Sequence, residues 1–342
     1  MPNRRPQPPS GPAALMPTTL DGKRIFVAGA TGLVGSAIVR ALLATTPGVA
    51  ITAAHRGNHG AFVDDPRLRY VRADLGTREG CAAAAAGCDL AVLAAAATGG
   101  AAQARREPWR QVTANVVMDS LLLEALHAAN VRRIVYIGSA TVYQDFDGFI
   151  REDQLDWNTD PSPAYLGVGW AKRYIEKQCA FWHRAAGIEF AIVRAANVYG
   201  PWSQFDPANS NFIAALIRKA VDRMEPFEVW GSPDVTRDVI YADDFADAIV
   251  RMMLEAPPFE VYNLGSERRT TVGEVMELAL KWAGHRPKEF RRLGEAPTTT
   301  AFRALDCAKA RTQLGWSPRI DPDEGVRRTV EWWLAHKDSW TR

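Results

Sequence analysis

Cysteine is scarce in this sequence, and no cluster of residues has the spacing of a metal site. The cysteines number four and contain no Cys-x-x-Cys pair; they are Cys81, Cys88, Cys179 and Cys307. This is too few for a disulfide framework, so we expect a protein of a reducing compartment, the cytoplasm. The six histidines are scattered, with neither a His-x-His nor a His-Glu-x-x-His spacing. We therefore expect no metal site.

Long apolar runs and an excess of one charge are also missing. No stretch approaches the roughly 18 apolar residues that would span a bilayer. The 41 basic and 39 acidic residues leave a net charge of +2, so we expect no nucleic acid and no membrane as partner. An anionic small molecule would need only a few arginines. Residues 1–20 are rich in proline, which predicts a disordered extension and argues against a signal peptide.

What the sequence does contain is a glycine-rich turn between an apolar run and a good helix sequence. Ile25–Ala28 predicts a strand, Ser36–Ala44 predicts a helix, and Gly29, Gly32 and Gly35 lie between them. The first glycine can adopt the backbone angles of the turn, the second lets backbone N–H groups approach phosphates, and the third allows tight packing of the helix. The dipole of the helix favours negative charge at its N-terminus. The turn therefore predicts a site for the pyrophosphate of a dinucleotide.

Strands and helices alternate after this turn, as in a βαβ fold. Apolar runs such as Ile134-Val-Tyr-Ile137 are typical of parallel strands covered on both faces. We predict an α/β protein with a doubly wound parallel sheet, the Rossmann fold, over residues 21–200, with returns to the sheet at about 236–265. Residues 201–235 and 266–342 are expected to form a smaller C-terminal α/β lobe that binds the substrate. Ligands in such folds lie at the carboxyl ends of the strands.

The end of the second predicted strand bears on the choice of dinucleotide. It contains His55 and Arg56, with no carboxylate to bind the ribose 2′-hydroxyl of NAD. A guanidinium suits a 2′-phosphate, so NADP is slightly preferred over NAD. The alternative is that Arg56 is a solvated loop residue. Asp74-Leu75 is placed to accept a hydrogen bond from the adenine amino group, and Ala95–Ala97 would offer backbone beside the pyrophosphate or ribose.

Several motifs occur in the order found in one known family. They are Gly29-x-x-Gly32-x-x-Gly35, Asp74-Leu75, Ala95-Ala-Ala97, Asn115, Ser139-Ala-Thr-Val-Tyr143, Lys172 and Asn197-Val-Tyr-Gly-Pro201. Together they resemble an extended short-chain dehydrogenase/reductase of the NAD-dependent epimerase/dehydratase family, over roughly residues 22–340. The resemblance implies a set of cofactor-binding residues: Gly29, Thr31, Gly32, Leu33, Val34, Gly35, His55, Arg56, Asp74, Leu75, Ala95, Ala96, Ala97, Asn115 and Lys172.

Within that family several stretches between Phe205 and Trp316 are most similar to the GDP-L-fucose synthases. Relatives use such stretches to hold the diphosphate and base of a nucleotide sugar. By this resemblance Arg237 and Arg303 face the substrate pyrophosphate, with Lys219 and Trp230 near it. Surface or interlobe salt bridges are the alternative for each arginine. The remaining residues that the resemblance places at the substrate are Thr141, Asn197 and Asn211.

The family's chemistry is hydride transfer assisted by a Ser or Thr, a Tyr and a Lys. Ser139 fits the first role and Lys172 the last, but the tyrosine expected one helical turn before the lysine is replaced by Val168. Tyr165 lies about 10.5 Å from Lys172 along a helix axis. It could take the role if Gly167 and Gly169 broke the helix. The other possibilities are Tyr143, near the end of the fifth strand, or no tyrosine acid/base at all.

Further departures narrow the expected reaction. The dehydratases' Thr-Asp-Glu is replaced by Ser139-Ala140-Thr141, which leaves no carboxylate for the elimination of water. The catalytic Cys and His of the fucose synthases are replaced by Thr141 and Asn211. We therefore expect an NAD(P)-dependent nucleotide-sugar epimerase or 4-keto reductase acting at C4 of the sugar.

Other readings of the same sequence remain open. One is a catalytically degenerate relative that binds cofactor and nucleotide sugar as a sensor or partner subunit, and another is a hydride enzyme for a non-sugar ketone. Relatives dimerise, and by analogy the predicted helices Val112–Ala129 and Ala171–Ala186 would form the interface of a homodimer.

Overall fold

The computed structural model describes residues 19–57, 63–98, 107–294 and 302–340, so the predicted extension lies almost wholly outside the described residues. Its centre is a seven-stranded sheet in the order β12-β7-β5-β4-β1-β2-β3, and every neighbouring pair is parallel. The strands are β1 (Arg24–Ala28), β2 (Ala50–His55), β3 (Leu68–Arg72), β4 (Leu90–Leu93), β5 (Arg133–Ile137), β7 (Glu189–Ala195) and β12 (Phe259–Leu264). The predicted doubly wound parallel sheet is confirmed.

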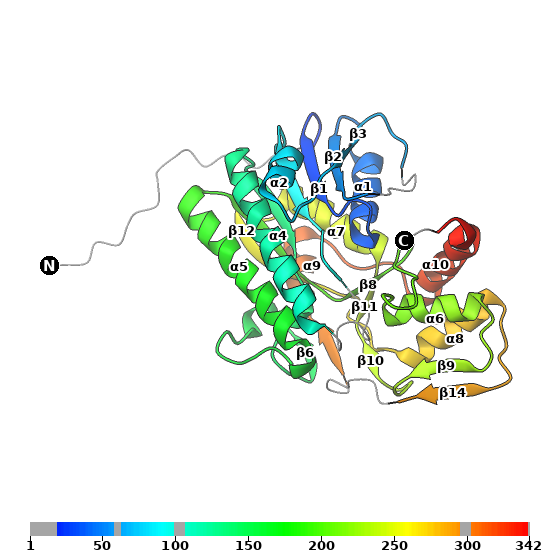
Figure 1. Ribbon diagram of the computed structural model, residues 1–342. Helices are drawn as coiled ribbons and strands as arrows, with labels where there is room; N and C mark the ends of the chain where they lie inside the picture. The colour runs from blue at the N-terminus through cyan, green and yellow to red at the C-terminus, as the bar shows by residue number, and fades with distance from the viewer. Residues whose placement is uncertain (1–18, 58–62, 99–106, 295–301, 341–342) are drawn as a thin grey trace.

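Helices cover both faces of this sheet (Figure 1). One layer holds α2 (Arg78–Ala85), α4 (Pro108–Ala128) and α5 (Leu166–Ala186), and the other holds α1 (Leu33–Thr45), α7 (Ala242–Glu255) and α9 (Ala308–Leu314). Side chains of a strand alternate between faces, and β1 shows the result. Ile25 and Val27 enter the core under α1 and α7, whereas Phe26 and Ala28 enter the core under α4 and α5.

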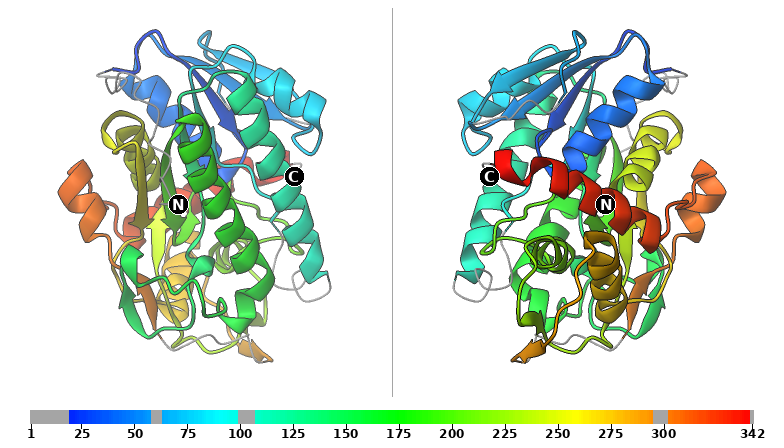
Figure 2. Two further views of the ribbon diagram at one scale, coloured as in Figure 1. Left: turned by 90° about the vertical axis from the view of Figure 1, so that its left-hand side faces the viewer. Right: turned by 90° about the vertical axis from the view of Figure 1, so that its right-hand side faces the viewer.

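A third core lies beside the sheet, at the carboxyl ends of its strands. It is built by α6 (Phe212–Val221), α8 (Val272–Ala283) and α10 (Pro322–His336), with the parallel pair β9 (Phe227–Trp230) and β14 (Phe290–Leu293) at the edge (Figures 1 and 2). Three further pairs join this lobe to the sheet: β6 (Gly148–Ile150) with β15 (Arg303–Leu305), β8 (Asn197–Tyr199) with β11 (Val239–Tyr241), and β10 (Thr236–Arg237) with β13 (Thr270–Thr271).

One part of the predicted C-terminal lobe packs elsewhere. Leu305, Leu314 and Trp316 lie in the sheet core together with α7, and α9 contacts both α7 and β12. The segment from β15 through α9 therefore returns to the sheet, as 239–264 does. Its apolar residues fill the space beside the edge strand β12.

Two element boundaries differ from those expected. The apolar run that starts at Leu90 continues to Ala97 and would fit a longer strand, but β4 ends at Leu93 and the chain then leaves the sheet. The helix predicted from Ala171 begins at Leu166 and continues through Gly167 and Gly169. A Cβ on Gly169 would lie 2.5 Å from the backbone oxygen of Thr141, so this glycine permits close packing and does not break the helix.

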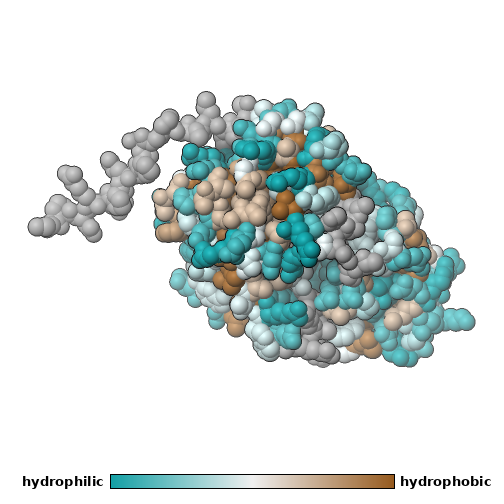
Figure 3. Space-filling model, turned by 45° about the horizontal axis from the view of Figure 1, so that its top comes forward, coloured by the Kyte–Doolittle hydropathy of each residue, from teal (hydrophilic) through white to brown (hydrophobic). Residues whose placement is uncertain are grey.

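The face seen in Figure 3 is mostly hydrophilic, with hydrophobic residues interspersed. Among the described residues, no helix is both long and apolar enough to cross a membrane. The four cysteines are buried free thiols.

Candidate functional site

The glycine-rich turn connects β1 to α1 with very close backbone contacts. Gly29 has a φ of 72°, and a Cβ there would lie 2.7 Å from the Cα of Ala95. A Cβ on Gly35 would lie 2.1 Å from the backbone oxygen of Gly29. Gly32 is the N-cap of α1 and supplies no side-chain cap, which leaves N–H groups of the first helical turn for another acceptor. The turn thus has the geometry that an anion at a helix N-terminus requires.

The other expected cofactor residues surround this turn along the carboxyl edge of the sheet. Arg56 follows β2 and is exposed, while the ring nitrogen Nδ1 of His55 lies 2.7 Å from the backbone oxygen of Gly57. Asp74 is exposed after β3, and its Oδ1 accepts a hydrogen bond from the N–H of Gly76 at 3.0 Å. Leu75, directly after it, is buried.

Asn115 holds the segment that follows β4. Its side-chain oxygen accepts from the N–H of Ala97 at 2.7 Å, and its amide donates to the backbone oxygens of Ala97 and Gln111. Asn115 is buried, so it acts on any ligand through the backbone of Ala95–Ala97 that it positions.

A pocket opens where β5, β7 and the lobe meet. Its lining includes six of the residues expected at the reaction or substrate: Ser139, Thr141, Tyr165, Asn197, Arg237 and Arg303. They come from five separate segments of the chain, since Ser139 and Thr141 share one turn. Sequence reasoning missed Phe146 and Asp238, which line the same pocket.

The cationic wall of the pocket is held by buried contacts. The guanidinium of Arg303 lies 4.6 Å from the ring centre of Phe146 and 6.0 Å from that of Tyr165. Burial lowers the pKa of Arg303. Its Nη1 is buried without a hydrogen-bond partner in the described parts of the chain, and the nearest carboxylate oxygen, of Asp145, is 3.7 Å away.

Asp238 ties three segments together behind this wall. Its carboxylate accepts from the N–H and hydroxyl of Ser266, at 2.7 and 2.9 Å, and from the N–H of Leu305 at 3.0 Å. Burial raises the pKa of Asp238, and these hydrogen bonds oppose the shift. Because Arg237 precedes Asp238 and Arg303 lies two residues before Leu305, these bonds fix the two arginines relative to each other.

Comparison with known proteins identifies the family. The model of the NAD dependent epimerase/dehydratase family matches residues 25–265, most of the chain. The chain belongs to this family.

Individual relatives agree with the family, at low identity. The "Probable GDP-L-fucose synthase 1" of Oryza sativa subsp. japonica is 29% identical over 326 residues, covering 92% of this chain and 93% of its own length. The GDP-L-fucose synthase of Escherichia coli (strain K12) is 26% identical over 335 residues, covering 92% and 98%. Among solved structures, a UDP-glucose 4-epimerase from Thermotoga maritima superposes with a TM-score of 0.80 at 23% identity, covering 92% and 99%. The last similarity shows the fold.

Within this family, α5 carries the departure noted in the sequence. Val168 occupies the turn before Lys172 in an unbroken helix. Tyr165 precedes the helix as its N-cap residue and reaches the pocket beside Ser139 and Thr141. The structure thus brings Tyr165 to the pocket without the helix break that the sequence argument required.

Tyr143, the other tyrosine considered for the family's proton transfer, is placed away from the pocket. It is fully buried, donates to Oδ1 of Asn263 at 2.7 Å and accepts from Nη1 of Arg194 at 3.0 Å. Burial raises its pKa to about 12. Arg194 is itself paired with Glu176 at 2.9 Å, so this hydroxyl belongs to a buried network in the core.

Lys172 points into the protein below the Ser139 turn. Its Nζ donates to the hydroxyl of Tyr136 at 2.9 Å and to the backbone oxygen of Ile137 at 3.4 Å, and lies 3.7 Å from Oδ2 of Asp119. Tyr136 in turn donates to the same Oδ2 at 3.1 Å. Sequence reasoning missed Tyr136 and Asp119, since one lay in an apolar strand and the other in a helix of unknown orientation.

Three residues expected at the substrate lie outside the pocket lining. Asn211 is the N-cap of α6, where its side chain accepts from the N–H of Ala214 at 3.0 Å. Lys219 donates to the backbone oxygen of Glu228 at 2.8 Å, and Trp230 is 47% exposed at the end of β9. They belong to α6 and β9 of the lobe, whereas the six residues named above line the pocket.

No group of three or more His, Cys, Asp or Glu side chains suited to a metal ion occurs within the described ranges. The pocket also contains the side-chain amide of Asn197 and the internally bonded carboxylate of Asp238, but its hydroxyls and guanidinium groups are donors that suit sugar hydroxyls and phosphate oxygens.

Proposed function

We propose that this protein is an NAD(P)-dependent nucleotide-sugar epimerase or 4-keto reductase that transfers hydride at C4 of the sugar. The observation that supports this most strongly is the pocket that groups Ser139 and Tyr165 with Arg237 and Arg303. A hydroxyl pair suited to a sugar oxygen and two cations suited to a diphosphate then share one cavity at the carboxyl edge of a dinucleotide-binding sheet.

Different residues of the pocket bind the diphosphate and transfer the proton. Arg237 and Arg303 neutralise the diphosphate, and the unpartnered Nη1 of Arg303 would gain an acceptor there. Ser139 hydrogen-bonds the oxygen on C4, and Tyr165 takes the proton from that oxygen or returns it. The hydroxyl of Thr141, buried with no hydrogen-bond partner among the described residues, would bond a further hydroxyl of the sugar.

The dinucleotide fits the glycine turn, whose close contacts leave no room for a Cβ at Gly29 or Gly35. We propose that the first turn of α1 binds the pyrophosphate, Asp74 the adenine, and Lys172 the nicotinamide ribose. Arg56 is exposed where a 2′-phosphate would lie, which favours NADP over NAD. Bound NAD(P) supplies the hydride acceptor and donor.

The function is tested with purified protein, NAD or NADP, and a panel of UDP-, GDP-, CDP- and dTDP-linked sugars and their 4-keto derivatives. We expect at least one sugar to be epimerised, or one 4-keto sugar to be reduced with loss of the absorbance of the reduced nicotinamide. Absence of both with every pair would contradict the proposal.

A second candidate function follows from Val168. A chain without the usual tyrosine could bind cofactor and nucleotide sugar without turnover, as a sensor or partner subunit. Val168→Tyr separates the two cases, because Lys172 lies one helical turn away. Activity that appears only in the variant supports the binding protein, whereas high activity in the unaltered protein supports proton transfer by Tyr165.

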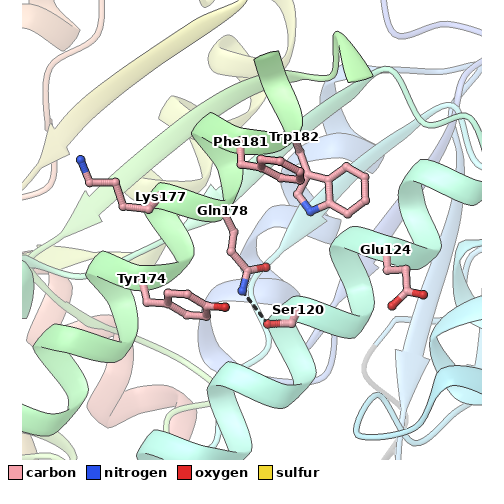
Figure 4. Close-up of a pocket in the computed structure, with 7 residues that line it drawn as sticks. All are labelled: Ser120, Glu124, Tyr174, Lys177, Gln178, Phe181 and Trp182. Carbon is pink, nitrogen blue, oxygen red and sulfur yellow. Dashed lines mark hydrogen bonds between the residues drawn. The ribbon is translucent and has the colours of Figure 1, made fainter. Parts of the chain in front are cut away.

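We also propose that the protein is a homodimer through α4 and α5. These helices lie side by side, joined by a hydrogen bond from Gln178 to Ser120 at 2.8 Å (Figure 4). Their outer face carries exposed aromatic side chains, including Trp109, Tyr174 and Phe181. A shallow hollow at this face is lined by Ser120, Glu124, Tyr174, Lys177, Gln178, Phe181 and Trp182. An apolar face of this kind gains stability when a second copy covers it.

A further inference from the structure

We propose that Asp119 and Tyr136 are positioning residues for Lys172, and that they replace the tyrosine missing at position 168 as its partners. Together they hold the side chain of Lys172 in one orientation behind the pocket. This inference rests on the proposed cofactor site. It assigns to Lys172 the binding of the cofactor and leaves the transfer of the sugar proton to Tyr165.

The contacts join three elements behind the pocket. Asp119 comes from α4, Tyr136 from β5 and Lys172 from α5, and their side chains are almost wholly removed from solvent. The ammonium donates to the phenol, and the phenol donates to the carboxylate. Each group therefore has its hydrogen-bonding direction set by the next, which defines a single orientation for the lysine.

The carboxylate of Asp119 and the ammonium of Lys172 stabilise each other. A carboxylate buried without a counter-charge is strongly disfavoured, and so is a buried ammonium. Burial raises the pKa of Asp119, and Lys172 is the cation that opposes this shift. Loss of the carboxylate would therefore leave Lys172 as an uncompensated buried cation.

Tyr136, on β5, supplies Lys172 with the hydrogen-bond partner that a tyrosine on α5 would otherwise supply. Its hydroxyl is 2.9 Å from Nζ of Lys172 and does not line the pocket. Burial and the neighbouring Asp119 raise its pKa well above the ordinary value. It can hold the lysine, yet it is poorly suited to exchange a proton with a substrate.

The other ionisable groups nearby are already satisfied or neutral. Cys179 lies on α5 beside Asp119 and Tyr136, and burial raises its thiol pKa well above the ordinary value. Glu176 is bound by Arg194 of β7 through two hydrogen bonds, at 2.9 and 3.1 Å. Within the described residues, Asp119 is the carboxylate paired with Lys172.

The experiment measures the dissociation constants of NAD and NADP by calorimetry. In Asp119→Asn, affinity should be about tenfold weaker, because Lys172 loses its counter-charge and its fixed orientation. Asp119→Glu, which restores the charge, should recover most of that affinity. Tyr136→Phe removes one hydrogen bond but keeps the charge pair, so a smaller loss is expected.

A second measurement does not depend on cofactor binding. The side-chain resonance of isotope-labelled Lys172, identified by its loss in Lys172→Met, should change position in Asp119→Asn, because the carboxylate beside the ammonium is removed. Asp119→Glu, which restores the charge, should move it back. An unchanged resonance and unchanged affinity in a folded Asp119→Asn protein would overturn the inference. Failure of the unaltered protein to bind either dinucleotide would instead overturn the proposed function.

Two variants serve as controls for effects on folding. Tyr262→Phe removes another buried phenol bond in the same sheet, to Gln313 at 2.8 Å, and should leave cofactor affinity unchanged. If Asp119→Asn does not fold, the double variant Asp119→Asn/Lys172→Met decides the matter. A folded double variant supports the pairing, whereas a double variant that also fails to fold contradicts it.

Discussion

Two polar atoms of the pocket have no hydrogen-bond partner in the described chain: Oγ1 of Thr141 and Nη1 of Arg303. A buried donor without an acceptor costs about 1–3 kcal/mol, so a ligand with oxygens at these points would recover that free energy on binding. Arg303 is the more informative, because its guanidinium is also charged.

Arg303→Met should raise the KM for the nucleotide sugar about tenfold or more while the dissociation constant of the cofactor stays unchanged. The unfolding midpoint should change little, because the Arg303 side chain forms no hydrogen bond within the described residues and loses only a 3.7 Å ion pair with Asp145. Arg24→Met is the matched control, because Arg24 is exposed at the opposite end of β1 and pairs only loosely with Asp89, at 3.6 Å. Steady-state kinetics that show the same KM for both variants would contradict the assigned role.

The two tyrosines considered for proton transfer can be separated by the same substitution. Tyr165→Phe should lower kcat by about 10²–10⁴ with little change in KM, and remove one limb of the pH–rate profile. Tyr143→Phe should instead lower stability by about 1–3 kcal/mol, because Asn263 and Arg194 lose a buried partner. The reverse pattern would move the acid/base role to Tyr143.

The proposed preference for NADP depends on a single exposed cation, Arg56. Arg56→Ala should weaken NADP binding by about 1.5–3 kcal/mol and leave NAD almost unaffected, since a charge-assisted bond to the 2′-phosphate is lost. Titration calorimetry with both dinucleotides measures the ratio. Equal losses for the two would show that Arg56 does not face the ribose.

At the scale of elements, the central strands β1, β4 and β5 were predictable because each is an apolar run buried on both faces. The ends of the strands were harder to predict. Ala94–Ala97 continues the small apolar character of β4, and the strand stops because the backbone there bonds to Asn115, a contact distant in sequence. The glycines of α5 were similarly ambiguous, since a glycine that allows close packing and one that breaks a helix look alike in sequence.

The candidate site was predictable where function is carried by backbone geometry, and less so where it depends on side-chain direction. The glycine turn needed only its spacing. Tyr136 lay in the apolar run of β5 and Asp119 within a long helix, and nothing in sequence shows that both face Lys172. The distance that weighed against Tyr165 was measured along a helix axis, whereas its side chain starts from the residue before the helix.

The packing of α1 on the turn gives a prediction at this scale. Gly35→Ala would place a Cβ 2.1 Å from the oxygen of Gly29, against backbone that cannot move without shifting β1 or α1. The variant should lose about 1–3 kcal/mol of stability in denaturant unfolding and bind either dinucleotide more weakly. Gly57→Ala meets nothing within 4 Å and should stay within about 0.5 kcal/mol of the unaltered protein. Equal stability of both variants would show that α1 can shift away from the turn.

For the whole molecule, the parallel sheet brings all candidate ligand groups to one edge. The lobe of α6, α8 and α10 lies along that edge, while α4 and α5 cover the sheet on one side and present their outer face to solvent. The proposed catalytic site and the proposed dimer face therefore lie on different surfaces, although α5 contributes to both through Lys172 and Phe181.

This separation predicts that the dimer can be disrupted without loss of cofactor binding. Phe181 is 57% exposed on the outer face of α5. The substitution Phe181→Glu should weaken the dimer, because a twofold interface would then bury two carboxylates. Light scattering coupled to gel filtration should show a dimer for the unaltered protein and a monomer for the variant. Leu334→Glu is the control, since Leu334 is similarly exposed, at 46%, but lies on α10. A monomeric unaltered protein, or a dimer that survives Phe181→Glu and not Leu334→Glu, would place the interface elsewhere.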